Sequence, residues 1–266
     1  MKYYMGVVFY NPTGEQCQKV TEYSSFGIFS KLIICDNSQT ILEYKFPDNV
    51  EYYHMGFNSG LSIPYNRFIT ISIEKEADVL CIMDQDSLFK ENDIKYIVNY
   101  IDEHYGELNE VAVVCPRLLK VNTVELEKEA SCKAEYVKWT INSGSFLIMK
   151  NIQKNKLCYD NNIFLDGVDK DFCMNIKLKN LKILRVNKSI LHQSFGYSYS
   201  GGGFDHHSAS RYFNIAHNRK YIYRKYYGIK GFLLAILVNT RLAFRILFHE
   251  DKRVEKVIAC LKGTFK

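Results

Sequence analysis

The stretch Val79-Leu80-Cys81-Ile82-Met83-Asp84-Gln85-Asp86-Ser87 decides the fold, because it joins a buried strand directly to a polar turn. Five apolar residues in a row are typical of a strand that is covered on both faces, as in a parallel sheet between helices. Asp84 and Asp86 stand two residues apart at the end of this strand and therefore point to the same side. Carboxylates at this spacing suit Mg²⁺ or Mn²⁺ that is also held by a pyrophosphate. Solvated turns contain the same Asp-x-Asp pair, but its position after a buried strand favours a functional role.

Outward from this strand, short apolar runs alternate with amphipathic stretches. We expect strands at 4–10, 31–36, 50–54, 79–83 and 111–115, and helices at 15–26, 61–76 and 91–105. Strands that alternate with helices of this length indicate βαβ units. The sequence therefore predicts an α/β, Rossmann-like, mostly parallel sheet flanked by helices, with its functional loops at the carboxyl ends of the strands.

The second half of the chain is less regular before it becomes helical. We expect a helix at 169–180 and a strand at 182–186, and the segment 196–207, rich in Gly, Ser, Tyr and His, indicates a loop. Helices at 208–227 and 231–248, with a short third helix to 262, form a predicted C-terminal helical extension.

Three further polar groups stand near the predicted strand and helix ends. Asp36-Asn37-Ser38 closes the second strand, where a carboxylate can bind a base or ribose, although these residues also favour an Asx turn. The segment 164–173 carries Asp166, Asp169 and Asp171 at a helix start, which suits either helix capping or a general base. His192 is either a structural histidine or a metal ligand.

These elements occur in the order seen in family 2 glycosyltransferases of the GT-A fold, and the match runs over nearly the whole chain. Asp84-Gln85-Asp86-Ser87 resembles the metal-binding motif of bacterial rhamnosyltransferases, and the segment 164–173 resembles the one that supplies the family's base. The resemblance implies a GT-A catalytic domain at 1–207, with a nucleotide-sugar half at about 1–116 and an acceptor half at about 117–207. The helical extension is then 208–266.

The resemblance also implies which residues form the site. Contacts to the nucleotide sugar are expected from Tyr10, Asn11, Asp36, Asn58, Asp84, Gln85, Ser143, Gly144, Arg211 and Tyr212. Asp86, Asp84 and His192 are expected to hold Mg²⁺ or Mn²⁺, and Asp169 or Asp166 to take the proton of the acceptor hydroxyl. The implied reaction is an inverting transfer of a sugar, with rhamnose from dTDP-rhamnose as the first choice. The implied acceptor is a glycan or a lipid-linked oligosaccharide of surface polysaccharide synthesis.

Two departures from the family bear on these roles. Relatives often carry Arg where this chain has Asn175 and His217. Many relatives carry Glu-Asp where this chain offers Asp166 and Gly167. The base therefore stays open between Asp169, which we favour, and Asp166, while Asp171 is assigned to the helix start.

The net charge of +6 belongs to the C-terminal part of the chain. From Arg211 onward there are 13 Lys and Arg against 3 Asp and Glu. The helix at 231–248 is apolar, contains only Arg241 and Arg245 as charges, and is marginal in length for spanning a bilayer. A basic, apolar helix suits peripheral contact with an anionic membrane. Packing on the catalytic domain or on a second subunit, and hence a homo-oligomer, stays an equal alternative.

Composition and missing motifs exclude several other classes. The N-terminus lacks the apolar segment of a signal peptide, and the 8 Cys are scattered without CxxC pairs, so we expect a cytoplasmic protein with reduced thiols. Glycine-rich dinucleotide and P-loop motifs are absent. A transferase that uses UDP-glucose or UDP-galactose is the first alternative, and a non-catalytic scaffold that binds nucleotide sugars is the second. The basic tail alone does not indicate nucleic-acid binding.

Overall fold

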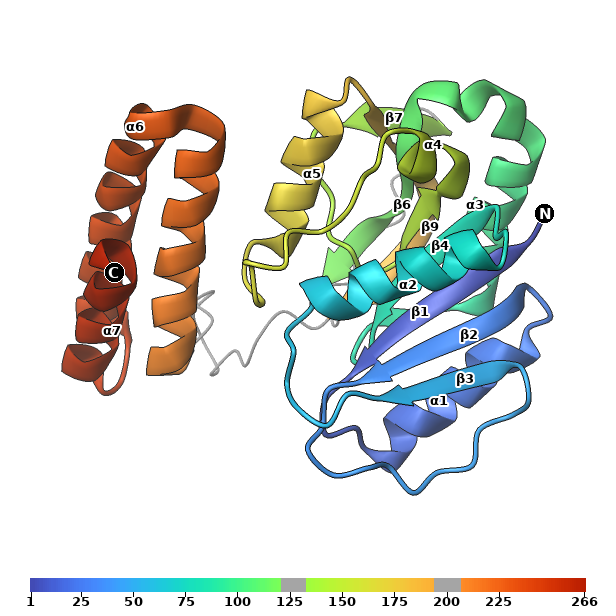
Figure 1. Cartoon of the computed structure of the whole chain (residues 1–266), viewed down its shortest axis with the longest axis horizontal. Helices are drawn as coiled ribbons and strands as arrows, with labels where there is room; N and C mark the ends of the chain where they lie inside the picture. Colours follow the sequence, from blue (N-terminus) through green and yellow to red (C-terminus); the bar gives the residue numbers. More distant parts are fainter. Residues whose placement is uncertain (121–132, 194–206) are drawn as a thin grey trace. The chain divides into compact units, whose positions relative to one another are not determined.

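The computed structural model describes residues 1–120, 133–193 and 207–266, and it divides into two compact units (Figure 1). Unit 1 comprises Met1–Asn161 and Phe172–Ser194, and unit 2 comprises Asn162–Asp171 and Phe195–Lys266. The expected loop at 196–207 lies, apart from His207, outside the described residues. The ten-residue segment that carries Asp166 and Asp169 thus groups with the C-terminal helices.

Unit 1 is an α/β unit whose elements follow the predicted order closely. Its strands are β1 (Tyr3–Phe9), β2 (Phe29–Asp36), β3 (Val50–His54), β4 (Val79–Asp84), β5 (Leu88–Phe89), β6 (Val111–Lys120), β7 (Ala134–Val137), β8 (Ser145–Ile148) and β9 (Lys182–Gln193). Its helices are α1 (Gly14–Ser25), α2 (Ser62–Glu74), α3 (Glu91–His104), the 3₁₀ helix η1 (Tyr105–Glu110) and α4 (Met149–Lys154), and α5 (Val168–Leu178) begins in unit 2.

The strands form one sheet in the order β3-β2-β1-β4-β8-β6-β9-β5, with β7 paired to β9. The ladders β1–β2, β2–β3, β1–β4 and β6–β9 are parallel. The ladders β4–β8, β6–β8, β5–β9 and β7–β9 are antiparallel. The expected α/β class with a mostly parallel sheet is confirmed, and the short strands β5, β7 and β8 add the antiparallel ladders to it.

Helices cover both faces of this sheet, which is why its central strands are apolar throughout. Every residue of β1 is buried. Met5 and Val7 face the core shared with α1 and α3. Gly6 faces the other side, where a Cβ at its position would lie 2.3 Å from Phe68 of α2. The glycine thus allows α2 to pack closely against the sheet.

Unit 2 contains α6 (Ala209–His249) and α7 (Arg253–Phe265), together with the segment Asn162–Asp171. The two helices expected at 208–227 and 231–248 are the arms of α6, separated at Gly228, whose φ of 58° and ψ of −138° are non-helical. We call residues 209–227 the first arm and 229–249 the second arm. A Cβ at Gly231 would lie 1.9 Å from the Tyr223 carbonyl oxygen, so this glycine lets the arms meet.

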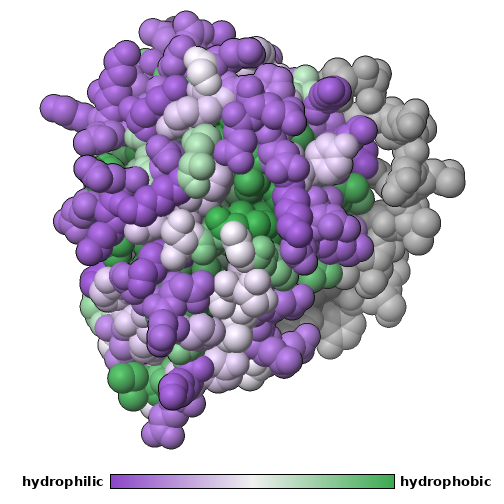
Figure 2. All heavy atoms as spheres, turned by 90° about the vertical axis from the view of Figure 1, so that its right-hand side faces the viewer, coloured by the Kyte–Doolittle hydropathy of each residue, from purple (hydrophilic) through white to green (hydrophobic). Residues whose placement is uncertain are grey.

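The surfaces of the two units differ in character. The face of unit 1 shown in Figure 2 is mainly hydrophilic, and apolar side chains reach it only in small areas. In unit 2, α6 is long and apolar enough to cross a membrane by length and composition alone, and only 28% of its most apolar window is buried. The core of unit 2 is small and includes Tyr212, Ala216, Ala243, Ile246 and Cys260.

Candidate active site

The carboxyl ends of β1, β2 and β4 meet at one edge of the sheet. Phe9 of β1 pairs with Asp36 of β2, and Val8 pairs with Asp84 of β4. The chain runs from β1 to β2 on one side and later to β4 on the other, so the strand order reverses around β1. Open α/β sheets bind ligands in the crevice outside the carboxyl ends at such a reversal.

Asp84 is held by side chains that come from three distant parts of unit 1. Tyr65 Oη donates to Asp84 Oδ1 at 3.1 Å, and Gln193 Nε2 donates to Asp84 Oδ2 at 3.3 Å. The Asp84 N–H donates to Ser143 Oγ at 3.1 Å, and Ser143 Oγ lies 2.7 Å from Ser87 Oγ. The acidic turn is therefore fixed at both ends, while Asp86 between them is exposed.

A second set of contacts joins this turn to the end of β1. Gln85 Oε1 accepts from the Tyr10 N–H at 2.8 Å, and Gln85 Nε2 donates to the Tyr10 carbonyl at 3.2 Å. The Asn11 N–H donates to Ser38 Oγ at 2.7 Å, which links β1 to β2. Four expected site residues, Tyr10, Asn11, Asp84 and Gln85, are thus brought together, and Tyr10 stays 49% exposed.

Asp36 organises the end of β2 from a fully buried position. Its carboxylate accepts from the Ser38 N–H at 2.9 Å and from Tyr52 Oη at 2.6 Å. Burial, together with the hydrogen bond to Asp36, raises the pKa of Tyr52 to about 12. Asn37 Nδ2 donates to the Gly60 carbonyl at 2.7 Å, which fastens the loop that carries the exposed Asn58. Asp36 therefore shapes the edge of the site from within.

The expected Ser-Gly segment packs beneath the acidic turn. The Gly144 N–H donates to the Ile82 carbonyl of β4 at 2.7 Å. Gly144 has a φ of 73°, and a Cβ there would lie 2.9 Å from Leu191. A side chain at Gly144 would therefore be strained, and the adjacent Ser143 contacts Asp84.

His192 lies on β9 opposite Leu88 of β5, just beyond the acidic turn. Gln193 Oε1 is buried, and within the described chain it accepts no hydrogen bond. Across residues 1–120, 133–193 and 207–266, no group of three or more His, Cys, Asp or Glu side chains is already close enough to hold a metal. Ser194, Phe195 and Gly196, which follow His192 and Gln193 in the sequence, lie outside the described residues.

The acids of the segment 162–171 lie against the first arm of α6. Arg211 donates to Asp166 Oδ1 from Nε at 3.3 Å and from Nη2 at 3.2 Å. Asn218 Nδ2 donates to the Asp166 carbonyl at 2.9 Å. Asp166 Oδ2 is buried and has no hydrogen-bond partner within the part of the chain that the structure describes.

Asp171 has a structural place in the same unit, as expected for a helix-start acid. Its carboxylate is 2% exposed and pairs with Lys225 Nζ at 2.8 Å. Tyr226 Oη donates to the same Oδ1 at 3.0 Å. Burial and the charge of Asp171 raise the pKa of Tyr226. Asp169, two residues earlier, is half-buried at the start of α5.

Gly167 and Tyr212 have packing roles in unit 2. Gly167 has a φ of 97°, and a Cβ there would lie 2.7 Å from Ile222 Cδ1, so this position favours glycine. Tyr212 is 1% exposed, and its hydroxyl donates to Glu250 Oε1 at 2.5 Å. This placement gives no support to the expected contact between Tyr212 and a nucleotide sugar.

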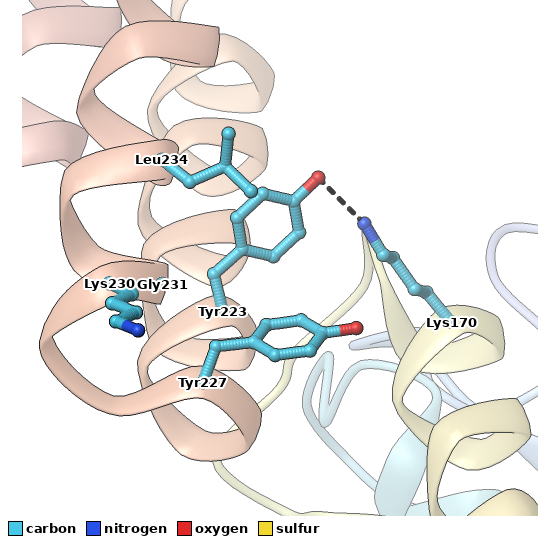
Figure 3. A pocket seen from close by; sticks show the side chains of 6 residues that line it. All are labelled: Lys170, Tyr223, Tyr227, Lys230, Gly231 and Leu234. Carbon is cyan, nitrogen blue, oxygen red and sulfur yellow. Dashed lines mark hydrogen bonds between the residues drawn. The ribbon is translucent and has the colours of Figure 1, made fainter.

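A hollow of about 410 Å³ opens beside Lys170 in unit 2 (Figure 3). Tyr223 and Tyr227 of the first arm line it with Lys230, Gly231 and Leu234. Lys170 Nζ donates to Tyr223 Oη at 2.9 Å and lies 4.0 Å from the centre of its ring. Two aromatic faces and two ammonium groups thus surround one hollow, next along the chain to Asp169.

Three residues that shape the site were assigned no role from the sequence. Tyr65 binds Asp84 and Tyr52 binds Asp36, but each lies in an ordinary helix or strand pattern. Gln193, which also binds Asp84, follows the candidate ligand His192 in the sequence. Their roles arise only from the packing of distant segments.

Comparison with known families and structures agrees with this architecture. The model of glycosyl transferase family 2 matches residues 32–164, half of the chain. A comparison with curated protein sequences finds no significant match.

Among solved structures, the chain is similar to TarS from S. aureus. TarS 1–349 in complex with UDP-GlcNAc aligns with a TM-score of 0.57 and 14% identity over 98% of this chain and 80% of that one. TarS 1–349 in complex with UDP aligns with a TM-score of 0.52 and 14% identity over 84% of this chain and 66% of that one. A longer TarS chain aligns with a TM-score of 0.54 and 15% identity, and this chain spans only 42% of its length.

At these identities the structural likeness shows the fold alone, and the expected GT-A fold is confirmed. The family model covers the strands and turns that carry Asp36, Asp84 and Asp86. The chain therefore belongs to glycosyl transferase family 2.

Proposed function

We propose that this protein transfers a sugar from a nucleoside diphosphate to an acceptor hydroxyl with inversion at the anomeric carbon. The observation that carries the proposal is the acidic turn at the strand reversal, where Tyr65, Ser143 and Gln193 hold Asp84 beside the exposed Asp86. A carboxylate pair in this crevice suits a diphosphate, because a shared divalent cation cancels the repulsion between them.

The residues of this turn fit Mg²⁺ or Mn²⁺ bound together with the donor. Mg²⁺ is usually held by one or two carboxylates plus substrate phosphates rather than by a complete protein cage. Asp86 and Asp84 supply such carboxylates, and the buried Gln193 Oε1 adds an oxygen beside them. His192 on the adjoining strand is the third proposed ligand. When bound, the metal neutralises charge that develops on the departing diphosphate.

In the proposed reaction, the acceptor oxygen bonds to the anomeric carbon while the bond from that carbon to the diphosphate oxygen breaks. The acceptor proton passes to a carboxylate of the protein. Asp169 and Asp166 are the candidates, and the buried Oδ2 of Asp166 supports that residue, since Arg211 occupies only its Oδ1. One displacement of this kind inverts the configuration.

For the donor we propose dTDP-rhamnose first, on the resemblance of Asp84-Gln85-Asp86-Ser87 to the rhamnosyltransferase motif. A UDP-sugar is the alternative, and the titles of the TarS structures, which name UDP and UDP-GlcNAc, favour it. The exposed ring of Tyr10 supports stacking of either pyrimidine base.

For the acceptor we propose a glycan or lipid-linked oligosaccharide that enters the hollow of Figure 3. Tyr223 and Tyr227 offer ring faces for a sugar, and Lys170 and Lys230 suit an acidic group on it. Such an acceptor is consistent with a location at the inner face of a membrane, which stays a prediction.

The proposal is tested first by thermal unfolding with dTDP, UDP, GDP and CDP, each with and without Mn²⁺. A ligand at about 100 times its dissociation constant stabilises the folded state by about 2.7 kcal/mol. A metal-dependent rise of the unfolding temperature with dTDP supports dTDP-rhamnose as the donor. A rise with UDP alone instead indicates a UDP-sugar as the donor. No shift with any nucleotide contradicts the proposal.

Substitutions then test the chemistry. Asp86→Asn should abolish turnover at saturating metal. Loss of the general base costs about 10²–10⁴-fold in turnover, so Asp166→Asn and Asp169→Asn, measured separately, identify it. Donor binding without turnover in the unaltered protein would instead support the non-catalytic scaffold.

A further inference from the structure

The second arm of α6 and helix α7 expose several large apolar side chains along their length. Leu237 is 68% exposed and Phe248 is 79% exposed. Leu233 and Phe244 on the same arm are also exposed, as are Val254, Ile258, Leu261 and Phe265 on α7. Isolated exposed apolar residues are ordinary, but a row of them along one helix marks an interaction surface.

The exposed residues of the second arm form one stripe. At 100° per residue, Leu233, Leu237, Phe244 and Phe248 fall within about 60° of one another around the helix axis. Arg241 and Arg245, both exposed, follow at one border of this stripe. The opposite side carries the buried residues Gly231, Ala235, Asn239, Ala243 and Ile246.

The second arm is fixed to the first arm along its buried side. Asn239 Nδ2 donates to the Ala216 carbonyl at 3.0 Å, and Arg219 Nη1 donates to Asn239 Oδ1 at 2.7 Å. Because its buried side packs on the first arm, the second arm exposes the apolar stripe along its length, on the opposite side of the helix. This geometry suits a helix that lies in a membrane interface rather than one that spans the bilayer.

The border of the stripe is strongly cationic. A hollow of about 290 Å³ is lined by Arg219, Arg241 and Arg245, with Val238 and Leu242. The whole of α6 contains eight Lys and Arg residues and no Asp or Glu. Guanidinium groups around one hollow suit a phosphate group, which they bind through paired N–H donors.

Charge decides between the two surfaces that such a stripe fits. A second copy of the chain, docked by two-fold symmetry through the same stripe, would bring two cationic borders into one interface. Like charges placed opposite one another oppose docking. An anionic lipid surface instead complements both the apolar stripe and its cationic border.

We propose that the stripe Leu233, Leu237, Phe244 and Phe248 inserts into the interface of an anionic bilayer, with a lipid phosphate in the hollow of Arg219, Arg241 and Arg245. This binding goes beyond the proposed transfer reaction and requires neither donor nor acceptor. It places unit 2 at a membrane that carries phosphatidylglycerol or a similar anionic phospholipid.

The test is co-sedimentation of the full chain with vesicles of phosphatidylcholine, alone or mixed with phosphatidylglycerol. The unaltered protein should bind the mixed vesicles, and binding should weaken as salt rises. Each cation near an anionic surface contributes about fivefold to partition, so Arg241→Gln with Arg245→Gln should weaken binding about 25-fold. Leu237→Ser with Phe244→Ser should weaken it about tenfold or more.

Matched controls separate these effects from general changes in charge and hydrophobicity. Lys177→Gln with Lys179→Gln removes two exposed charges from unit 1, and Ile41→Ser with Leu178→Ser removes two exposed apolar side chains there. Neither control should change vesicle binding. A nucleotide-induced thermal shift that persists in all variants shows that the donor site is intact, so the two proposals fail independently.

Three outcomes would overturn the membrane proposal. The first is that the unaltered protein stays in solution with mixed vesicles at low salt. The second is equal binding of the arginine variant and the unaltered protein. The third is a stable dimer in sedimentation velocity that Leu237→Ser with Phe244→Ser dissociates, since this outcome assigns the stripe to a second copy.

Discussion

Replacement of Ser143 by alanine tests whether the acidic turn is held in position by the segment beneath it. Ser143 is 1% exposed, and its Oγ accepts from the Asp84 N–H and shares a hydrogen bond with Ser87 Oγ. Each such bond contributes about 0.5–1.5 kcal/mol net, so the loss of two should destabilise the protein by about 1–3 kcal/mol. For a chain of this size, each kcal/mol of lost stability lowers Tm by about 2–4 °C.

The same substitution at Ser145 is a matched control. Ser145 is also 1% exposed, but its Oγ donates to the Ile141 carbonyl at 2.6 Å and does not contact the turn. Ser145→Ala should therefore lower Tm only by the amount that the loss of one hydrogen bond causes, and it should leave donor affinity unchanged. Ser143→Ala should also weaken binding of the donor nucleotide with Mn²⁺ about tenfold, measured by titration calorimetry, because the turn loses its fixed geometry. Equal donor affinities of the two variants would refute the reasoning.

Three further predictions address other parts of the chain. Gly167→Ala should destabilise the protein by about 1–3 kcal/mol in urea unfolding, because Gly167 has a φ of 97° and an added Cβ would lie 2.7 Å from Ile222. Gly106→Ala should not destabilise the protein in this way, because an added Cβ at Gly106 meets no atom within 4 Å. Burial raises the pKa of Cys35 to about 12 and of Cys115 to about 11. Alkylation at mildly alkaline pH, mapped by mass spectrometry, should therefore modify the exposed Cys158 well before the six cysteines that are buried in the described part of the chain, and fast labelling of Cys35 would contradict this. Burial raises the pKa of Tyr23 from 10.0 to about 12, so the folded state holds the hydroxyl proton more tightly than the unfolded chain does. The urea midpoint of unfolding should therefore fall as the pH rises from about 10 to 12. In Tyr23→Phe the midpoint should fall less steeply over the same range.

The strands of unit 1 were predictable because each is a compact apolar run that ends at a turn residue. The segment 50–54 was expected as a strand and is β3. The segment 141–150 contains a Ser-Gly-Ser turn followed by a short apolar run, which holds β8 and the start of α4, and periodicity cannot divide so short a run. β5 has only two residues and exists because it pairs with β9, so no local pattern could indicate it.

The site was predictable where neighbours in sequence are also neighbours in space. Asp84 and Gln85 gain their places from the end of β4 itself, which the apolar run before them indicates. Tyr65 and Gln193 reach Asp84 from 19 and 109 residues away. Such contacts depend on how α2 and β9 pack on the sheet, and no pattern within either segment encodes them.

The C-terminal helices are expected to matter for catalysis as well as for any membrane contact. Arg211 and Asn218 hold Asp166, and Lys225 and Tyr226 hold the buried Asp171, so the first arm fixes both ends of the acidic segment. A chain that ends at residue 207 would lose all four partners and leave a buried carboxylate without its ammonium group, which is strongly destabilising. The donor residues in unit 1 have no such dependence, because their partners all lie within that unit. Truncation at 207 should therefore remove turnover while the nucleotide-induced thermal shift persists. Loss of both together would show that the two units do not fold independently.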